Sequence, residues 1–340
     1  MKSKMLKGCL IGAGYIGKTH AEAYQKISGV QLTAVADNNQ EKAEELAAIH
    51  GGKGYGDYGK MIEAERPDFV DVCLPSRLHR EGVITALTAG CHVIVEKPFA
   101  VDLEAIDAML AAAERSGNRL MVAHVCRFMP QYVYAHRVIS EKSLGNPLFY
   151  NCWRNSETPN WSWDGWLLNK SLSGGTIMDL SIHDIDIANW FFGIPEGYRA
   201  CESFRLGKVG PSHVMSFLSY PNGPRASIEG GHLMPKGYPF TMGYRLLFDE
   251  GIIEWNNQWN NRETGPSFLQ VFTDDREERI NLSGLPSLTP KGANGLADPY
   301  AEELAHFAAC LVSGEPFRIA TGEARLAVET VLKLMTKIIT

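Results

Sequence analysis

Short apolar runs alternate with helix-length amphipathic segments over roughly the first 125 residues of the chain. The runs that fit strands cover residues 8–14, 31–37, 69–75, 92–98 and 119–125. Strands that alternate with helices favour a parallel sheet, because right-handed crossovers place helices on both of its faces. We therefore predict an α/β domain over residues 1–125, built on a doubly wound parallel sheet.

The pattern changes after about residue 147, where longer stretches alternate between apolar and polar positions. Gly, Pro and Asn turn signals separate these stretches, which predicts antiparallel strands. The expected strands lie at residues 147–155, 212–221, 225–233, 244–257 and 267–275. Helical periodicity is found at residues 174–193, 297–314 and 321–339. We expect an α+β domain over residues 126–340 with a large, mostly antiparallel open sheet, and its last helices could pack back on the first domain.

Charge and cysteine content narrow the classes of partner. The net charge is −6, and no run of Lys or Arg would follow a phosphate backbone, so we expect neither a nucleic-acid nor a membrane partner. The seven cysteines are scattered without a C-x-x-C pair, which argues against a zinc ribbon and against a disulfide framework. No apolar stretch is long enough to span a bilayer or to form a signal segment. A small-molecule partner and a cytoplasmic location are the expectations.

A glycine-rich turn directly follows the first predicted strand and opens a helix. The sequence "CLIGAGYIGKTHAEAY" places glycines at 12, 14 and 17, the spacing of a dinucleotide-binding (Rossmann) turn. In such a turn the helix N-terminus carries partial positive charge for a pyrophosphate, whereas the alternative is a glycine-rich turn without a ligand. The residues expected to contact the cofactor here are Gly12, Ala13, Gly14, Tyr15, Ile16 and Gly17.

Asp37 ends the second predicted strand, twenty residues after Gly17. An acid at this place would accept hydrogen bonds from the adenosine ribose hydroxyls and would repel a 2′-phosphate. Asn38 and Asn39 follow it, and no nearby Arg or Lys would neutralise that phosphate. The sequence therefore favours NAD over NADP, although Asp37 could instead be a turn or cap residue.

Three further stretches carry a resemblance to a known family. They are "CLPSRLHREGVITALTAGCHVIVEKPFA", "RFMPQY" and "GGTIMDLSIHDIDIANW", in that order. Together with the glycine turn they resemble the Gfo/Idh/MocA oxidoreductases, which include glucose-fructose oxidoreductase and inositol dehydrogenase. The pattern of that family has a Pro and a His after the fourth strand, a Glu-Lys-Pro after the fifth, and a helix with an acid four residues before a His. The resemblance covers essentially the whole chain.

The resemblance implies that the nicotinamide lies where the fourth and fifth strands end. Its neighbours would be Leu74, Pro75, Ser76, His79, Glu96 and Lys97. Adjacent strand residues point to opposite sides, so Lys97 can face the substrate while Glu96 turns toward the cofactor or the backbone. Without the resemblance, Lys97 could equally be a solvated strand end.

The "MDLSIHDID" segment brings Asp179 and His183 to one face of a predicted helix, with Asp186 nearly on the same face. The resemblance implies that His183 exchanges the hydroxyl proton during oxidation, and that Asp179 binds substrate or orients the ring. A capped surface network is the structural alternative. A metal site is a further alternative for this segment. We do not expect it, because no additional ligand from a distant part of the sequence is evident.

Arg127 in "CRFMP" matches an arginine of the family that would contact substrate or hold the hinge. Trp161, Trp163 and Trp166 precede the glycine pair at 174–175. Tryptophans there could stack on a sugar ring, with Trp163 and Trp166 the expected substrate contacts, or they could be core or interface residues.

These observations predict an NAD-dependent dehydrogenase that oxidises a secondary alcohol of a cyclic polyol or sugar, with Lys97, Asp179 and His183 as catalytic residues. One alternative is an NAD-dependent glycoside hydrolase that acts by transient oxidation and elimination. Another is a non-catalytic cofactor-sensing protein. We also expect a homodimer or homotetramer that forms through the C-terminal sheet, because apolar strands there need a cover.

Overall fold

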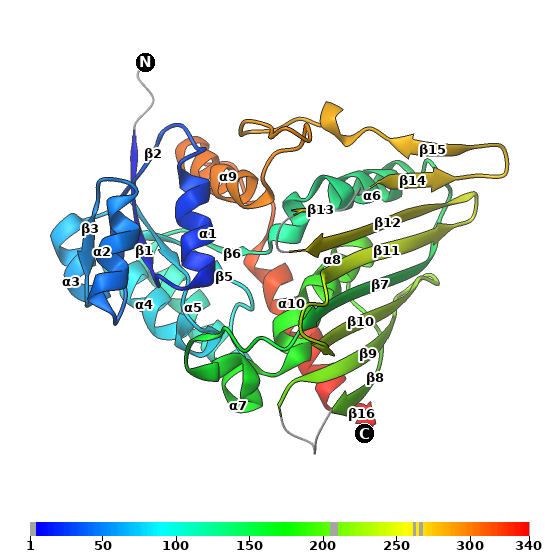
Figure 1. The fold of residues 1–340 in the computed structure, drawn as a ribbon, viewed down its shortest axis with the longest axis horizontal. Helices are drawn as coiled ribbons and strands as arrows, with labels where there is room; N and C mark the ends of the chain where they lie inside the picture. Colours follow the sequence, from blue (N-terminus) through cyan, green and yellow to red (C-terminus); the bar gives the residue numbers. More distant parts are fainter. Residues whose placement is uncertain (1–4, 205–209, 261–262, 265–267, 340) are drawn as a thin grey trace. The chain divides into compact units, whose positions relative to one another are not determined.

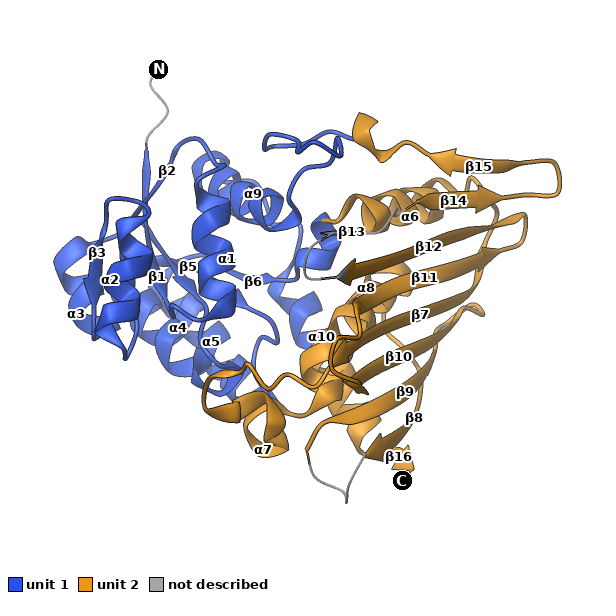
Figure 2. Ribbon diagram, viewed as in Figure 1, with its two compact units in different colours: residues 1–128, 285–325 blue, residues 129–284, 326–340 orange. Residues whose placement is uncertain are grey.

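The structure is a computed structural model that describes residues 5–204, 210–260, 263–264 and 268–339. Its chain divides into two compact units, coloured in Figure 2. Unit 1 comprises residues 1–128 and 285–325, and unit 2 comprises residues 129–284 and 326–340. The domain ranges expected from the sequence, 1–125 and 126–340, stay a prediction.

Unit 1 contains a six-stranded sheet in which every neighbouring pair of strands is parallel (Figure 1). The strand order is β3-β2-β1-β4-β5-β6, the doubly wound order of dinucleotide-binding folds. Its strands are β1 (Leu6–Ile11), β2 (Val30–Ala36), β3 (Lys53–Tyr55), β4 (Phe69–Val72), β5 (His92–Glu96) and β6 (Leu120–Ala123). The predicted fold class of this part is confirmed, although the sequence did not indicate β3.

Most helices of unit 1 begin at a side chain that caps the first turn. Asn39, Asp57 and Asp102 each accept a backbone N–H bond from the first turn of the helix that follows. The helix α4 packs against both α3 and α5, and α1 packs against α9. The helices are α1 (Tyr15–Tyr24), α2 (Gln40–Ala48), α3 (Tyr58–Glu65), α4 (His79–Thr88), α5 (Leu103–Ser116) and α9 (Pro299–Ser313).

The helix α9 belongs to the core of unit 1, although it begins about 170 residues after the end of the first segment of that unit. Leu304 and Phe307 of α9 share a buried apolar cluster with Leu10 and Phe69. The rings of Phe69 and Phe307 meet edge to face, with their centroids 5.4 Å apart. The first unit is therefore completed by a segment from the last part of the chain.

Unit 2 contains a ten-stranded sheet with the order β15-β14-β12-β11-β7-β10-β9-β8-β16, and β13 pairs with β12 (Figure 1). Its pairs are antiparallel except β7 with β10 and β8 with β16, which confirms the predicted mostly antiparallel sheet. Residue 267 of the expected strand 267–275 lies outside the described residues. The strands are β7 (Pro147–Glu157), β8 (Gly197–Phe204), β9 (Ser212–Ser219), β10 (Arg225–Met234), β11 (Phe240–Phe248), β12 (Gly251–Asn260), β13 (Glu263–Thr264), β14 (Leu269–Phe272), β15 (Glu277–Ile280) and β16 (Ile338–Ile339).

Helices cover one face of this sheet. The helix α8 packs on β7 and β10, and a π-helical turn at Ile177–Ser181 runs directly into α8. A Cβ atom at Gly230 would lie 2.1 Å from the Ser181 Oγ, so the glycine allows β10 to approach the π-helical turn. The helices of unit 2 are α6 (Pro130–Glu141), α7 (Lys170–Ser173), α8 (Ile182–Phe192) and most of α10 (Thr321–Met335).

The opposite face of the same sheet carries exposed apolar side chains. Leu247 pairs with Phe149 on one side and with Ile252 on the other, so the three share a face. Phe149, Phe217 and Leu247 are each exposed.

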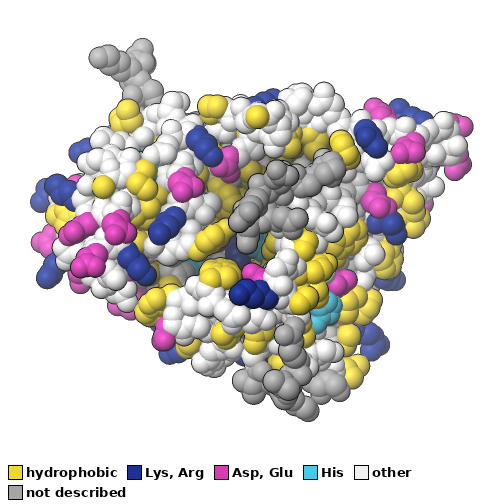
Figure 3. Space-filling model, viewed as in Figure 1, with side chains coloured by type: hydrophobic (Ala, Val, Ile, Leu, Met, Phe, Trp, Pro, Cys, Tyr) yellow, Lys and Arg dark blue, Asp and Glu magenta, His cyan; other side chains and the backbone are white. Residues whose placement is uncertain are grey.

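Figure 3 shows Lys and Arg side chains scattered among acidic ones on the surface in view. Among the residues described, no helix has both the length and the apolarity needed to cross a bilayer.

Candidate functional site

The glycine turn after β1 has two glycines that the fold itself requires. Gly12 has a φ of +103°, and a Cβ there would lie 2.4 Å from the Cys73 carbonyl oxygen. A Cβ at Gly17 would lie 1.8 Å from the Gly12 oxygen. A Cβ at Gly14, in contrast, would meet nothing within 4 Å. Gly14 therefore leaves open space directly beside the backbone, where a pyrophosphate could approach.

The start of α1 lacks a side-chain cap. Gly14 is its N-cap, and no side chain caps the first turn, unlike in α2, α3 and α5. The first N–H groups of a helix have no partner within it and carry partial positive charge. The open space at Gly14 and this uncapped helix end fit a diphosphate. Tyr15 is exposed and Ile16 half-buried at this end, whereas Ala13 is buried.

Asp37 follows β2 and holds the glycine turn. Its carboxylate accepts the Ala13 N–H at 2.8 Å and the Asn39 N–H at 2.9 Å. The second bond is the turn contact that the sequence left open as an alternative. Each carboxylate oxygen can accept more than one hydrogen bond, so these contacts leave acceptor capacity for ribose hydroxyls.

Leu74, Pro75 and Ser76 follow β4, and His79 begins α4. His79 is fully buried, with Nε2 2.8 Å from the Leu74 oxygen and Nδ1 3.0 Å from the Pro98 oxygen. Burial lowers the pKa of His79. The ring therefore links the segment after β4 to the segment after β5.

Glu96 is the last residue of β5, and the half-buried Lys97 follows it. Glu96 is only 5% exposed, and its Oε2 accepts the backbone N–H of Lys97 at 2.9 Å. Its Oε1 lies 3.1 Å from Nε2 of His20 in α1. Glu96 thus turns toward the backbone and the interior, one of the two orientations expected for it.

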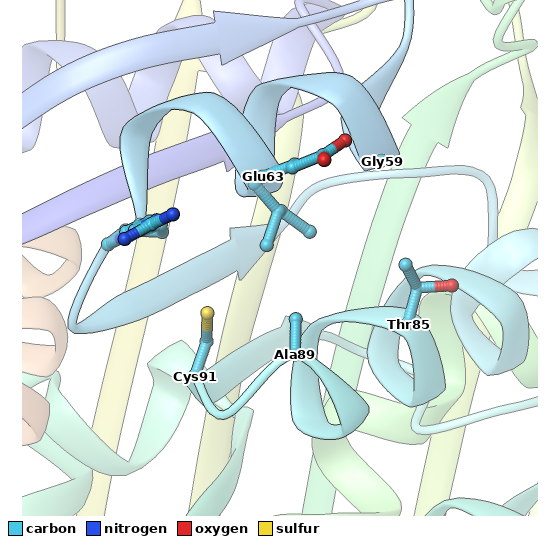
Figure 4. Close-up of a pocket in the computed structure, with 8 residues that line it drawn as sticks. Gly59, Glu63, Thr85, Ala89 and Cys91 are labelled. Atoms are coloured by element: carbon cyan, nitrogen blue, oxygen red, sulfur yellow. The ribbon is translucent and has the colours of Figure 1, made fainter.

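Unit 1 also contains a cavity of about 390 Å³, which none of the predicted cofactor-site residues lines (Figure 4). Its lining includes Pro67 and Cys91, which precede β4 and β5, so it lies near the amino ends of these strands. Dinucleotides bind outside the carboxyl ends of parallel strands. The cavity is therefore separate from the predicted cofactor site.

In unit 2, Asp179 lies in the π-helical turn and His183 in the first turn of α8. A π-helical turn holds more residues than an α-helical one, so the pair stands close to one turn apart and on one side of the helix. Gly174 and Gly175 have positive φ values, and the Gly175 oxygen accepts the Asp179 N–H at 3.0 Å. The glycine pair therefore fixes the backbone at the start of this turn.

His232 of β10 is a neighbour of Asp179 that the sequence analysis did not identify. Its Nε2 lies 3.7 Å from the Asp179 Oδ2, and its side chain is buried. The sequence signal that could have indicated this neighbour is the glycine pair at 230–231, because glycines inside a strand mark the close approach of another backbone. The acid of the predicted pair thus has an imidazole from the sheet beside it.

Asp186 does not fit the surface-network alternative, because it is fully buried. Asp184 is buried as well, and the Arg154 guanidinium contacts both of its carboxylate oxygens, at 2.7 and 3.0 Å. This ion pair joins α8 to β7. The acids that follow His183 therefore belong to the interior of unit 2.

Arg127 and the three tryptophans, the remaining candidates for substrate contact, lie in different surroundings. Arg127 is 1% exposed, and its Nη1 lies 2.8 Å from the Glu323 carboxylate. This ion pair lies within unit 1, and both roles expected for Arg127 stay predictions. Trp161 and Trp163 are exposed and Trp166 is half-buried, so none of the three is a core residue.

The predicted site residues therefore fall into two groups, each assembled within its own unit. In unit 1, the glycine turn, Asp37, the segment after β4 and the Glu96–Lys97 pair all follow strands of one parallel sheet. In unit 2, Asp179, His183 and the tryptophans lie on the segments between β7 and β8.

Comparisons with known proteins agree with this arrangement. Residues 6–124 match the family model described as "Oxidoreductase family, NAD-binding Rossmann fold", and residues 132–254 match the "GFO/IDH/MocA C-terminal domain". The chain belongs to the Gfo/Idh/MocA oxidoreductase family. The resemblance expected from the sequence and the oxidoreductase class are thereby confirmed.

Two relatives of this Gfo/Idh/MocA chain are named as sugar dehydrogenases. It is 33% identical to the D-apiose dehydrogenase of Paraburkholderia graminis, over 84% of this chain and 72% of the relative. It is 30% identical to the levoglucosan dehydrogenase of Pseudarthrobacter phenanthrenivorans, over 87% and 82%. An Agrobacterium radiobacter oxidoreductase solved with NAD+, L-tartaric acid and magnesium shares the fold, with a TM-score of 0.82 at 21% identity over 98% of this chain and 96% of that one.

Proposed function

We propose that this family member is an NAD-dependent dehydrogenase that oxidises a secondary alcohol of a cyclic polyol or sugar. The observation that carries the proposal is the placement of Lys97 after β5, on the same sheet edge as the glycine turn and with its backbone held by Glu96. A lysine there can stabilise the negative charge that develops on a substrate oxygen. The names of the two sugar dehydrogenases support the substrate class.

In this proposal the glycine turn and Asp37 hold the cofactor. His183 accepts the hydroxyl proton, while Asp179 binds the substrate or orients the imidazole. Lys97 donates to the substrate oxygen as it gains alkoxide character. NAD, when bound, supplies the hydride acceptor. Trp163 and Trp166 offer faces on which a sugar ring can stack.

A screen of polyols, aldoses and sugar acids with NAD tests the proposed activity, with formation of reduced nicotinamide followed by absorbance. We expect turnover of at least one cyclic polyol or sugar. Release of sugar from an aryl glycoside without net NADH would instead identify the glycoside hydrolase alternative. Tight binding of NAD without turnover of any alcohol would identify a cofactor-sensing protein.

We predict that the protein prefers NAD to NADP by at least about tenfold in affinity, the scale of one lost hydrogen bond plus charge repulsion. The reason is the Asp37 carboxylate, which would face a 2′-phosphate. Calorimetric titration of both cofactors measures the preference, which Asp37→Ser should reduce. Asp57→Ser, which removes the acidic cap of α3, is the matched control. Equal affinities in the unmodified protein would show that Asp37 does not reach the ribose.

We also predict a homodimer or homotetramer that buries the open face of the unit 2 sheet. Exposed Phe149, Phe217 and Leu247 lie on this face, where contact with a second copy would remove them from water. Light scattering at micromolar concentration should give two or four times the chain mass, and Leu247→Glu should lower it. Val312→Glu, at an exposed apolar position of α9, should not. A monomeric mass for the unmodified protein would contradict the prediction.

A further inference from the structure

Unit 1 contains a buried group of ionisable side chains directly behind Glu96, which we call the His20 cluster: His20, Tyr24, Asp71, Cys73 and Glu96. His20 lies at its centre and is 0% exposed. Its Nδ1 lies 2.9 Å from the Asp71 Oδ2, and its Nε2 lies 3.1 Å from the Glu96 Oε1. The imidazole is thus placed between two carboxylates, one from β4 and one from β5.

Counting donors and acceptors determines how many protons the cluster holds. An ionised carboxylate only accepts hydrogen bonds, and a neutral imidazole has a single N–H. Asp71 already accepts from the Tyr24 hydroxyl at 3.0 Å and from the Cys73 thiol at 3.4 Å, and Glu96 accepts the Lys97 N–H. A neutral His20 would therefore turn a lone pair toward one of the two carboxylates. An imidazolium instead carries its positive charge between them, with Nδ1 2.9 Å from Asp71 Oδ2 and Nε2 3.1 Å from Glu96 Oε1, although Nε2 makes no aligned hydrogen bond.

We infer that His20 is a permanently protonated positioning residue, an imidazolium that fixes the Glu96 carboxylate beneath the backbone of Lys97 and thereby holds the reactive end of β5. The contact path runs from Asp71 through His20 to Glu96, and from Glu96 to the Lys97 N–H. His20 also neutralises one of the two buried negative charges behind this lysine. Its importance for turnover rests on the proposed function, whereas its protonation does not.

The groups around His20 are consistent with one resident cation. Burial opposes a charge on His20, but the neighbouring Asp71 carboxylate favours the imidazolium, and the pKa of His20 lies above its usual value. Burial raises the pKa of Cys73 and of Tyr24, so both remain neutral donors. From α9, Tyr300 packs its ring 5.8 Å from the His20 ring, and burial raises its pKa as well. Glu303 of α9 also acts on the Tyr24 end of the cluster.

A metal ion is the competing explanation, because His20, Asp71 and Cys73 offer three ligand atoms within 4.8 Å of one another. The Nδ1 to Oδ2 separation of 2.9 Å is a hydrogen-bond distance, and the lone pairs of Asp71 already receive the Tyr24 and Cys73 protons. These contacts favour a shared proton over a metal. Elemental analysis of the purified protein separates the two, and a stoichiometric metal bound through His20 would overturn the inference.

Nitrogen-15 NMR of the histidine rings tests the protonation without any turnover. At about pH 8 an ordinary histidine is neutral, whereas we expect His20 to show two protonated ring nitrogens. The signals are assigned by their loss in His20→Gln. His50, whose pKa is lowered by burial, should be neutral in the same spectrum. A single protonated nitrogen on His20 at neutral pH would overturn the inference, whether or not the protein oxidises any alcohol.

The pH profile of kcat/KM for alcohol oxidation tests the link to Lys97. His20→Gln removes a positive charge, so the proton acceptor should hold its proton more tightly. The rise of kcat/KM should move to higher pH by at least about half a unit. The double variant His20→Gln with Glu96→Gln removes one charge of each sign and should move the rise back toward its original place.

Glu22→Gln is the matched control for this profile, because it removes a charge from the exposed side of α1 and leaves the cluster intact. Its profile should coincide with that of the unmodified protein. A purely structural role for His20 would lower thermal stability and leave the position of the rise unchanged in His20→Gln, which would overturn the positioning role. If His20→Gln does not fold, Asp71→Asn gives the second measurement, since it should make the His20 ring lose its second proton at lower pH.

Discussion

Replacing Lys97 with methionine should lower kcat for alcohol oxidation at least about a hundredfold and leave the affinity for NAD within a few-fold. Methionine has a similar length without the charge, so the change removes the ammonium while it keeps most of the packing at this half-buried position. The backbone N–H of residue 97 would still bind Glu96, so the end of β5 should keep its structure. Steady-state kinetics and calorimetric titration measure the two quantities separately.

The matched control is Lys60→Met, which removes an exposed lysine from α3 of the same unit. It should leave both kcat and the affinity for NAD unchanged. If Lys97→Met instead retains turnover and only its melting temperature changes, Lys97 is a solvated strand end. The proposed mechanism would then lack its cation.

Replacing His183 with alanine should lower the rate at least about a hundredfold, the usual scale of general-base assistance. A base must be neutral to accept the substrate proton, so kcat/KM should rise with pH through the pKa of the catalytic group in the unmodified protein. The reference pKa of histidine is about 6.5, and an ionised Asp179 nearby would favour the imidazolium and move the rise upward. The measured value belongs to the coupled groups rather than to His183 alone. The rise should be absent in His183→Ala.

Asp179→Asn extends the same experiment. It should lower the rate and move the rise toward lower pH, because a neutral amide no longer stabilises the imidazolium. His232 also lies beside Asp179, so His232→Gln should move the rise less than Asp179→Asn does. His213→Ala, a half-exposed histidine of β9, is the control. An unchanged pH profile in His183→Ala would exclude this residue as the base and point to Lys97.

The parts of the fold that depend on local patterns could be predicted from the sequence. The strands β1, β2, β4, β5 and β6 are short, mostly apolar runs, because a parallel sheet covered on both faces buries most of their residues. The strand β3 has only three residues at the sheet edge and none of them is buried, so it left no apolar run to find. The strand β15 was missed for the same reason, since its residues are mostly exposed.

The site was predictable where one short stretch contains the whole motif. The glycine turn and Glu-Lys-Pro are such stretches, because backbone geometry fixes the spacing of their residues. The neighbours of these motifs come from distant segments: His20 reaches Glu96 from 76 residues away, and His232 reaches Asp179 from the sheet. The π-helical turn was also hidden, because one extra residue in a turn changes the backbone without changing the local pattern of apolar positions.

The late arrival of α9 has a consequence for how the protein is made. Phe69 is synthesised early, whereas Phe307, which packs on it, follows residue 128 by about 180 residues, or roughly 10 to 40 s at 5–20 residues per second. During that interval the nascent first unit exposes the apolar surface that α9 later covers. A chain that ends before α9 would lack Leu304 and Phe307 of this core. The first unit can therefore complete its core only after α9 has been synthesised.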